Sequence, residues 1–394
     1  MMHEAVIVDA VRSPMGKGKT GGSLSEVHAV DLLAQVLKGL VERNAINPKL
    51  IDDIIVGCVT QAGEHGGTPG RMAALAAGFP ESIPSTTIDR KCGSSQQAVH
   101  FAAQGIMSGA YRMTIAAGIE SMSRVPMGSA RLGQDGAGPL VAKRYAPGLI
   151  NQGIAAELVN QRWQLDRETL DSYAVRSHQR AATHTERGLF QDEIIPIQTP
   201  NGLLNTDETI RPNSSSSALA ELEPAFRNSD SHSRFPDIDW KVTAGNSSQI
   251  TDGASALLIM ERSLAESLGL KPLARFIAFD VIADDPLLML TAPIPATRRV
   301  LEKARLGLDN IDHFEINEAF ASVPLAWQKE FGVDNDRLNP CGGAIALGHP
   351  LGASGARLMT TMLHSMHRNG DRYGLQTMCE AGGMANATII ERLS

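Results

Sequence analysis

The sequence predicts an α/β fold made of two similar halves, with a loop-rich segment inserted between them. The two ends of the chain resemble each other, because residues 51–58 align with residues 311–318, and residues 111–118 align with residues 373–380 after a nearly equal interval. Each of these segments contains a short apolar run of the kind that forms a buried strand. Between residues 123 and 250 the composition changes to Gly-rich and Ser-rich stretches, which are typical of loops. These features favour an internal duplication.

A glycine- and serine-rich turn opens a helix between the strands of each half. The first turn begins the segment 92–98, and the second begins the segment 352–358. Each half therefore reads strand, turn, helix and strand. Two such halves would pack by pseudo-twofold symmetry, with their turns meeting at the shared seam. Chance similarity between two α/β segments is the alternative to duplication.

The same pattern predicts the limits of three structural units. We expect residues 1–122 and 251–271 to form the N-terminal half, residues 123–250 to form a loop domain, and residues 272–394 to form the C-terminal half. The loop domain contains a helical segment at about 167–187. Loops inserted over a rigid scaffold commonly carry substrate contacts; a surface excursion that only supports an oligomer interface is the alternative.

Composition and charge argue against several classes of protein. The 394 residues suffice for two or three domain-sized cores without a disulfide or a metal. The net charge is −7 and Lys and Arg never run beyond a pair, so neither nucleic acid nor an anionic membrane is an expected partner. No apolar run approaches the ~20 residues that cross a bilayer. Four widely spaced cysteines, with no signal peptide or address tripeptide, predict a cytoplasmic protein with free thiols and no metal site.

Cys92 is the first candidate for catalysis. It follows the polar turn at 89–91 and precedes a helical run, so its sulfur is expected at or near a helix N-terminus. The macrodipole there favours the thiolate, and a nearby imidazolium would do the same, which makes Cys92 a candidate nucleophile. A small buried hydrophobic residue is the alternative role for a free cysteine.

His349 and Cys379 lie in two glycine-rich turns of the C-terminal half. His349 stands between Gly348 and Pro350 on a constrained turn, where it can act as a base or hydrogen-bond donor; tying the loop together is its alternative role. Cys379 ends a strand and precedes a turn containing Gly382, whose backbone amides can point at a ligand. A thiol at that place can transfer a proton, and a buried core cysteine is the alternative.

Asn317 marks the carboxyl end of the strand predicted at 311–318. Sheets of α/β proteins bind ligands at this end of their strands, so the Asn317 amide is suited to hold a water or a carbonyl oxygen. An asparagine at a strand end also commonly forms a turn.

Together, these motifs resemble the thiolase family over the whole chain. The resemblance implies a layered α-β-α-β-α core. The sequence around Cys92, at 151–153 and at 389–392 is most similar to bacterial degradative 3-ketoacyl-CoA thiolases, including those that act on steroid side chains. This similarity implies a role in fatty acid β-oxidation or steroid degradation. The motifs, in the family's order, are residues 12–16, the segment around Cys92, residues 245–248 with 252–254, residues 317–320, residues 348–350 and the Cys379 turn.

The resemblance implies a role for each candidate residue. The cysteine matching Cys92 attacks the 3-oxo carbon of the substrate, and acetyl-CoA leaves as an enolate. The histidine matching His349 activates that cysteine and, with a water held by the asparagine matching Asn317, donates hydrogen bonds to the thioester oxygen. The cysteine matching Cys379 protonates the enolate and then deprotonates coenzyme A, which is a co-substrate and not a bound cofactor. Ping-pong kinetics are expected.

The resemblance also implies where coenzyme A binds. Ser248 matches a serine that hydrogen-bonds the pantetheine arm, and Arg211 matches a cation near the CoA nucleotide; ordinary loop polarity is the alternative for both. Gly382 is a further expected contact. One departure is Ala381, where the family usually has a glycine whose N–H holds the oxyanion of the acyl-enzyme step. Alanine keeps that N–H but is restricted if its φ is positive.

Three other functions share parts of this pattern. A biosynthetic acetyl-CoA acetyltransferase would run the same chemistry in reverse, although residues 151–152 are Asn-Gln where short-chain biosynthetic enzymes commonly have His-Met. Ala381 suggests a catalytically weak CoA-binding scaffold. A carrier-protein-dependent condensing enzyme would share the fold but would have a second histidine in place of the Asn317 segment. The family's usual assembly, a homodimer or homotetramer, is expected.

Overall fold

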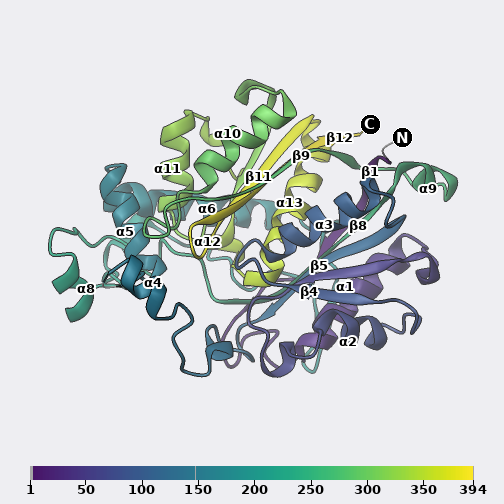
Figure 1. Cartoon of the computed structure of the whole chain (residues 1–394), viewed down its shortest axis with the longest axis horizontal. Coiled ribbons are helices and arrows are strands. Elements are labelled where there is room, and N and C mark those ends of the chain that lie inside the picture. The colour runs from purple at the N-terminus through teal and green to yellow at the C-terminus, as the bar shows by residue number, and fades with distance from the viewer. Residues whose placement is uncertain (1–2, 147, 394) are drawn as a thin grey trace.

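The computed structural model describes residues 3–146 and 148–393 (Figure 1). Within them, ten strands form one mixed sheet in the order β4-β3-β5-β8-β1-β9-β12-β11-β10, with the short β2 paired to β8. The strands are β1 (Ala5–Arg12), β2 (Gly16–Lys17), β3 (Asp53–Gly57), β4 (Ser85–Ile88), β5 (Met113–Ser121), β8 (Thr251–Glu261), β9 (Ala274–Ala283), β10 (His313–Ile316), β11 (Tyr373–Glu380) and β12 (Met384–Arg392).

This sheet consists of two halves with the same strand arrangement. In the first half β3 is parallel to β4 and β5, whereas β8 is antiparallel to β5 and β1. In the second half β10 is parallel to β11, and β12 is antiparallel to β11 and β9. Leu338 bridges Phe314 in parallel, in the place that β4 occupies in the first half. Because β3 and β10 coincide with the first pair of aligned segments and β5 and β11 overlap the second, the predicted duplicated α/β architecture is confirmed.

Helices complete five layers, as the predicted α-β-α-β-α core requires (Figure 1). α3 and α13 pack against each other between the two halves of the sheet. α1 and α2 cover the outer face of the first half, and α10 and α11 cover that of the second. None of the described helices is both long and apolar enough to span a membrane. The helices outside the inserted segment are α1 (Ala29–Arg43), α2 (Pro69–Ala76), α3 (Ser94–Met107), α9 (Arg262–Ser267), α10 (Pro293–Ala304), α11 (Ser322–Phe331), α12 (Ala344–Leu347) and α13 (Ser354–Asn369).

The central layer packs closely because small residues face each other at the start of α3 and α13. A methyl group on Gly355 would overlap the backbone nitrogen of Gln96. Next to this contact, the Ala356 N–H donates to Ser95 Oγ at 2.9 Å. The two glycine-rich turns therefore meet at the seam, as the repeat predicts.

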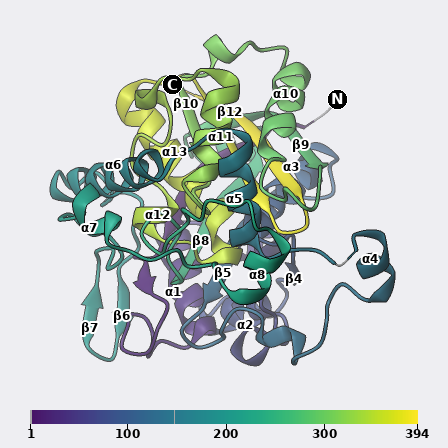
Figure 2. The same cartoon turned by 90° about the vertical axis from the view of Figure 1, so that its left-hand side faces the viewer.

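Between β5 and β8 the chain forms a separate set of short elements. The helix predicted at 167–187 is α6 (Arg167–Glu186), and α4 (Pro139–Arg144) projects away from the body (Figure 2). β8 then returns the chain to the first half of the sheet. The predicted limits of the three units stay a prediction. The remaining elements of this insertion are α5 (Gln152–Arg162), β6 (Ile197–Thr199), β7 (Gly202–Leu204), α7 (Ser216–Ala220) and α8 (Ser229–Arg234).

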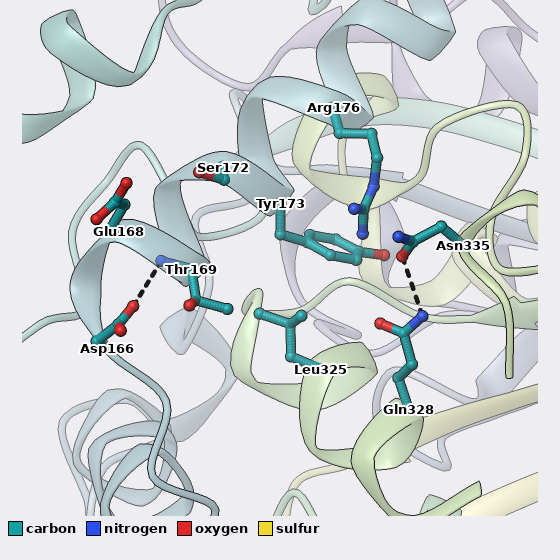
Figure 3. Close-up of a pocket in the computed structure, with 9 residues that line it drawn as sticks. All are labelled: Asp166, Glu168, Thr169, Ser172, Tyr173, Arg176, Leu325, Gln328 and Asn335. Carbon is teal, nitrogen blue, oxygen red and sulfur yellow. Dashed lines mark hydrogen bonds between the residues drawn. The ribbon is translucent and has the colours of Figure 1, made fainter. Parts of the chain in front are cut away.

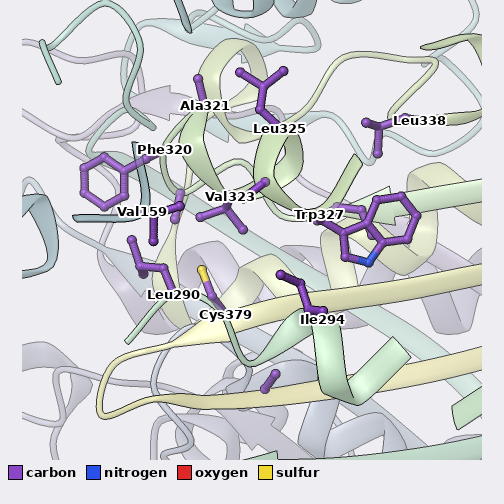
Figure 4. Close-up of a cluster of buried hydrophobic side chains, with 14 of the residues drawn as sticks. Val159, Leu290, Ile294, Phe320, Ala321, Val323, Leu325, Trp327, Leu338 and Cys379 are labelled. Atoms are coloured by element: carbon purple, nitrogen blue, oxygen red, sulfur yellow. The ribbon is translucent and has the colours of Figure 1, made fainter. Parts of the chain in front are cut away.

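A large apolar cluster fills the space between the second half of the sheet and its outer helices (Figure 4). Trp327 of α11 is fully buried in it, and its indole N–H donates to Thr297 Oγ1 at 2.9 Å. The Trp327 ring centroid lies 5.1 Å from that of Phe314 in β10. This packing fixes β10, the strand directly before Asn317.

Replacing Gly355 with alanine is expected to lower the free energy of unfolding by about 1–3 kcal/mol, because the added methyl group must displace the Gln96 backbone. Urea unfolding of the purified variant measures this change. Gly136→Ala is the matched control, since only the flexible Arg131 side chain lies near a methyl group at that position. Equal stability of the two variants would contradict the close contact between α3 and α13.

Candidate active site

Cys92 is held in a tight turn between β4 and α3. Lys91 has a left-handed backbone, with φ at 48°, and its N–H donates to Asp89 Oδ1 at 2.7 Å. α3 begins at Ser94, with Gly93 as its N-cap. Cys92 therefore lies at a helix N-terminus, where the sequence predicts it.

Burial decides the protonation state of Cys92. The residue is 5% exposed, and burial together with the negative charge of Glu380 raises the pKa of Cys92 to about 12. The backbone N–H groups of Cys92 and Ala381 oppose this rise. The helix macrodipole contributes about 0.3–1 kcal/mol, which is less than one pKa unit and does not outweigh desolvation. The thiolate that the helix N-terminus favours is therefore not the resting form, and Cys92 rests as a thiol.

His349 is neutral, and its hydrogen bonds fix its tautomer. Burial, with the nearby Arg357 cation, lowers the pKa of His349 to about 3. Its Nδ1 lies 2.6 Å from Ser354 Oγ, and the Ser354 hydroxyl donates to the Pro350 carbonyl oxygen at 2.8 Å. Because the hydroxyl proton is used there, Ser354 accepts from Nδ1–H, and Nε2 keeps its lone pair. His349 can therefore accept a proton at Nε2. Sequence analysis did not single out Ser354, although it opens α13.

Asn317 lies beside Nε2, the unprotonated nitrogen of His349. Its Nδ2 is 3.4 Å from His349 Nε2, and its backbone N–H donates to the Thr377 carbonyl oxygen at 3.1 Å. Asn317 is 1% exposed, yet its Oδ1 has no hydrogen-bond partner among the described residues. A buried amide oxygen of this kind is suited to hold a water or a ligand atom. The structure thus brings two of the predicted residues together.

Cys379 is the last residue but one of β11 and lies in apolar surroundings. Leu290 and Phe320 belong to the buried cluster around it (Figure 4). Burial raises the pKa of the Cys379 thiol well above its usual range, and negative charge at Cys92 or Glu380 adds to the rise. A methyl group on Gly93, the residue after Cys92, would overlap the side chain of Glu380, the residue after Cys379, so the two predicted cysteines lie on segments that touch. Both cysteines rest as thiols.

The turn after Cys379 shows how Ala381 is accommodated. The positive φ angles fall on Gly382, at 92°, and Gly383, at 81°, whereas Ala381 lies outside the positive region. The Ala381 N–H stabilises negative charge on Cys92. Alanine therefore supplies the same backbone amide as glycine without strain. Gly382 itself is exposed.

Ser248 and Arg211 lie on loops that meet beside His349. The Ser248 N–H donates to the Ala319 carbonyl oxygen at 3.0 Å. The next residue, Gln249, accepts from the His349 N–H at 3.1 Å through its carbonyl oxygen and from Arg211 Nη2 at 3.4 Å through its side chain. Arg211 is exposed and Ser248 is half-buried. The arrangement puts a hydroxyl close to the buried site and a cation nearer to solvent.

Glu318 supports these loops and was missed by sequence analysis. Its Oε1 accepts from Tyr173 Oη–H at 2.9 Å and from Asn339 Nδ2 at 3.1 Å. Its Oε2 accepts from Ser177 Oγ–H at 2.7 Å and from the Ile345 N–H at 3.0 Å. This carboxyl group ties α6 to α12, the short helix that precedes His349. The only signal in the sequence was its place in the polar end of a strand.

Cys58, His65 and Glu120 form a buried cluster with the side-chain types of a metal site. Their atoms are already used: His65 Nδ1 lies 3.0 Å from the Thr60 carbonyl oxygen, and His65 Nε2 accepts from the Ser121 N–H at 3.1 Å. Glu120 accepts from backbone amides, including the Thr60 N–H at 3.0 Å. Because both ring nitrogens are engaged, this donor set does not fit a metal and instead stabilises the loops.

A surface pocket of about 380 Å³ lies apart from the predicted site (Figure 3). Its lining comes mainly from α6 and α11, and none of the predicted catalytic residues takes part. The lining residues are Asp166, Glu168, Thr169, Ser172, Tyr173, Arg176, Leu325, Gln328 and Asn335.

Comparison with known proteins identifies the family. Residues 5–263 match the model of the thiolase N-terminal domain, and residues 270–392 match that of the thiolase C-terminal domain. The chain is 45% identical to the steroid 3-ketoacyl-CoA thiolase FadA6 of Mycobacterium tuberculosis, over 100% of this chain and 95% of that protein. It is 43% identical to a 3-ketoacyl-CoA thiolase of Salmonella typhimurium over the full length of both. The crystal structure of the Bacillus anthracis acetyl-CoA acetyltransferase superposes with a TM-score of 0.88 at 36% identity, covering 100% of this chain and 99% of the other. The chain belongs to the thiolase family.

Proposed function

We propose that this protein cleaves 3-oxoacyl-CoA esters with coenzyme A, releasing acetyl-CoA and a shortened acyl-CoA. The observation that carries the proposal is that two thiols, Cys92 and Cys379, and the imidazole of His349 are all buried and uncharged, and that the unprotonated Nε2 of His349 can take a proton. The names of the Mycobacterium tuberculosis and Salmonella typhimurium relatives support the degradative direction and an acyl substrate from fatty acids or steroids.

In the first half-reaction Cys92 Sγ attacks the C3 carbonyl carbon while His349 Nε2 takes the thiol proton. The bond between C2 and C3 then breaks, leaving an acyl-thioester on Cys92 and the enolate of acetyl-CoA. The protonated Nε2 and a water held by Asn317 donate hydrogen bonds to the enolate oxygen, which stabilises charge only as it develops. Cys379 gives its proton to C2 of the enolate and becomes a thiolate.

In the second half-reaction the Cys379 thiolate takes the thiol proton of coenzyme A. The coenzyme A sulfur attacks the acyl carbon on Cys92, and the backbone N–H groups of Cys92 and Ala381 hold the resulting oxyanion. Cys92 leaves and recovers its proton from His349. Because one product departs before the second substrate reacts, ping-pong kinetics follow. Ser248 and Arg211 hold the pantetheine arm and the nucleotide, and Gly382 is a further contact.

The reverse reaction, in which two acetyl-CoA molecules condense, is the second candidate function. The likeness to the Bacillus anthracis acetyl-CoA acetyltransferase supports it. The same residues serve both directions, because Cys379 can remove a proton from C2 as well as add one. A CoA-binding scaffold without activity is less well supported, since Ala381 retains its amide without strain.

Assembly and location complete the proposal. The inserted segment carries the exposed apolar side chains Met127, Leu132 and Leu140, which supports a homodimer or homotetramer that covers them. The cysteines are free, which supports a cytoplasmic setting, where thiols stay reduced. The inserted segment at 123–250 is also proposed to act as the loop domain that contacts coenzyme A.

Freshly reduced wild-type protein is expected to cleave members of a panel of 3-oxoacyl-CoA esters, from acetoacetyl to long-chain and steroid side-chain forms. Cys92→Ala should lower the rate at least about 10³-fold, because it removes the group that forms the acyl-enzyme. Loss of the 3-oxoacyl-CoA absorbance measures the rate. Cys341→Ala, which changes another buried cysteine, should remain active. Absence of CoA-dependent cleavage across the panel by the wild type would refute the proposed function.

Ser354→Ala is expected to lower kcat about 10- to 100-fold with little change in KM, because His349 loses the acceptor that fixes its proton on Nδ1. A general base contributes about 10²–10⁴-fold, and a misplaced proton forfeits part of this. Steady-state kinetics with the preferred substrate measure the effect. Ser365→Ala on the same helix is the control. A kcat within twofold of wild type for Ser354→Ala would show that Ser354 does not set the tautomer.

A further inference from the structure

Glu380 is a buried acid beside the reacting thiols that the proposed mechanism does not use. It ends β11 directly after Cys379 and is 0% exposed. Neither carboxyl oxygen has a hydrogen-bond partner of normal geometry among the described residues. On its other side it touches the nucleophile turn, since a methyl group on Gly93 would overlap Glu380 Oε1. A buried carboxylate without donors is unfavourable by several kcal/mol, so the group is expected to be an uncharged acid.

Charged and titratable groups face Glu380 from two directions. Asp89, Arg90 and Cys92 belong to the turn before α3. Cys379 precedes Glu380 on its own strand. Burial raises the pKa of Glu380 to about 8, with a contribution from Asp89, although the Arg90 cation and the backbone amide of Asn386 on β12 oppose the rise. The Arg90 cation is therefore too weak to keep the carboxyl group ionised at neutral pH.

The charge of Glu380 acts on both reacting thiols. Negative charge on Glu380 raises the pKa of Cys92 and the pKa of Cys379. Every anion of the proposed mechanism forms in this region: the two thiolates, the enolate and the acyl-enzyme oxyanion. An ionised Glu380 opposes all of them, whereas an uncharged Glu380 opposes none.

We propose that Glu380 is a positioning residue that acts through Cys92 and Cys379: as an uncharged acid it permits both thiols to deprotonate, and its ionisation suppresses them. This inference rests on the proposed function for its catalytic meaning. Ionisation of Glu380 then limits the rate of turnover in alkaline solution, where an ordinary cysteine enzyme gains thiolate.

The test compares wild type with Glu380→Gln, which has nearly the same shape and cannot ionise. The rate constant for alkylation of Cys92 by iodoacetamide is measured by peptide mass spectrometry from pH 6.5 to pH 9.5. The ratio of variant to wild type is expected to rise about three- to tenfold across this range, because a like charge nearby shifts a pKa by up to a unit or more. A ratio that stays constant within twofold would overturn the proposal.

Glu391→Gln is the matched control. Glu391 lies on the same hairpin, at the far end of β12, where it pairs with Arg275 and Arg372. Glu391→Gln should leave the ratio of the alkylation rate constants, variant to wild type, unchanged across the pH range. Alkylation requires no substrate, so a chain that alkylates as expected but cleaves no 3-oxoacyl-CoA would refute the proposed function alone. An active thiolase with a flat ratio would refute this inference alone.

Thermal unfolding provides a second readout that does not involve cysteine. The pKa of Glu380 is raised from about 4.5 to about 8 on folding, so the folded state binds a proton that the unfolded state releases. Wild type should therefore lose stability relative to Glu380→Gln as pH rises above 4.5, and the difference in Tm should reach its full size above pH 8. A Tm difference that does not change with pH would show that Glu380 is charged in the folded protein and would also overturn the proposal.

Discussion

The close contact between the starts of α3 and α13 is the constraint on which the rest of the site depends. Gly57, Gly118 and Gly355 each lie so near the opposing backbone or helix start that a methyl group would overlap it. Cys92 comes two residues before α3, and His349 comes five residues before α13. The glycines therefore do more than relieve local crowding. They fix the separation of two turns that belong to different halves of the chain.

Burial then determines the chemistry available at that seam. Cys92, Cys379 and His349 all have their pKa values moved toward the neutral form, chiefly by desolvation. A site that starts without charge gains most from fixed dipoles when charge appears, because those dipoles need no reorganisation at the moment of reaction. The Ala381 and Cys92 amides and the Asn317 side chain are dipoles of this kind. Each is held by a strand end or a tight turn, which keeps it in place.

Much of the fold could be predicted from the sequence, because its signals are local. The runs at 51–58 and 311–318 are apolar strands in equivalent positions, and the structure makes them β3 and β10. The position of Cys92 before a helix was equally readable. The protonation state of Cys92 was not, because it depends on burial and on the charge of groups as distant in sequence as Glu380. For the same reason the hydroxyl that orients His349 could not be assigned before the packing of its turn was known.

The insertion between β5 and β8 shows how a segment read as loops contributes to the site. Tyr173 and Ser177 of α6 both donate to Glu318, the residue after Asn317. Glu318 in turn accepts from the Ile345 N–H in α12, the short helix that precedes His349. A segment that was only a surface excursion would leave this carboxyl group without two of its buried donors, at a cost of several kcal/mol. The insertion therefore helps to fix the positions of Asn317 and His349 relative to each other. Its packing supports the proposed active site from outside the duplicated core.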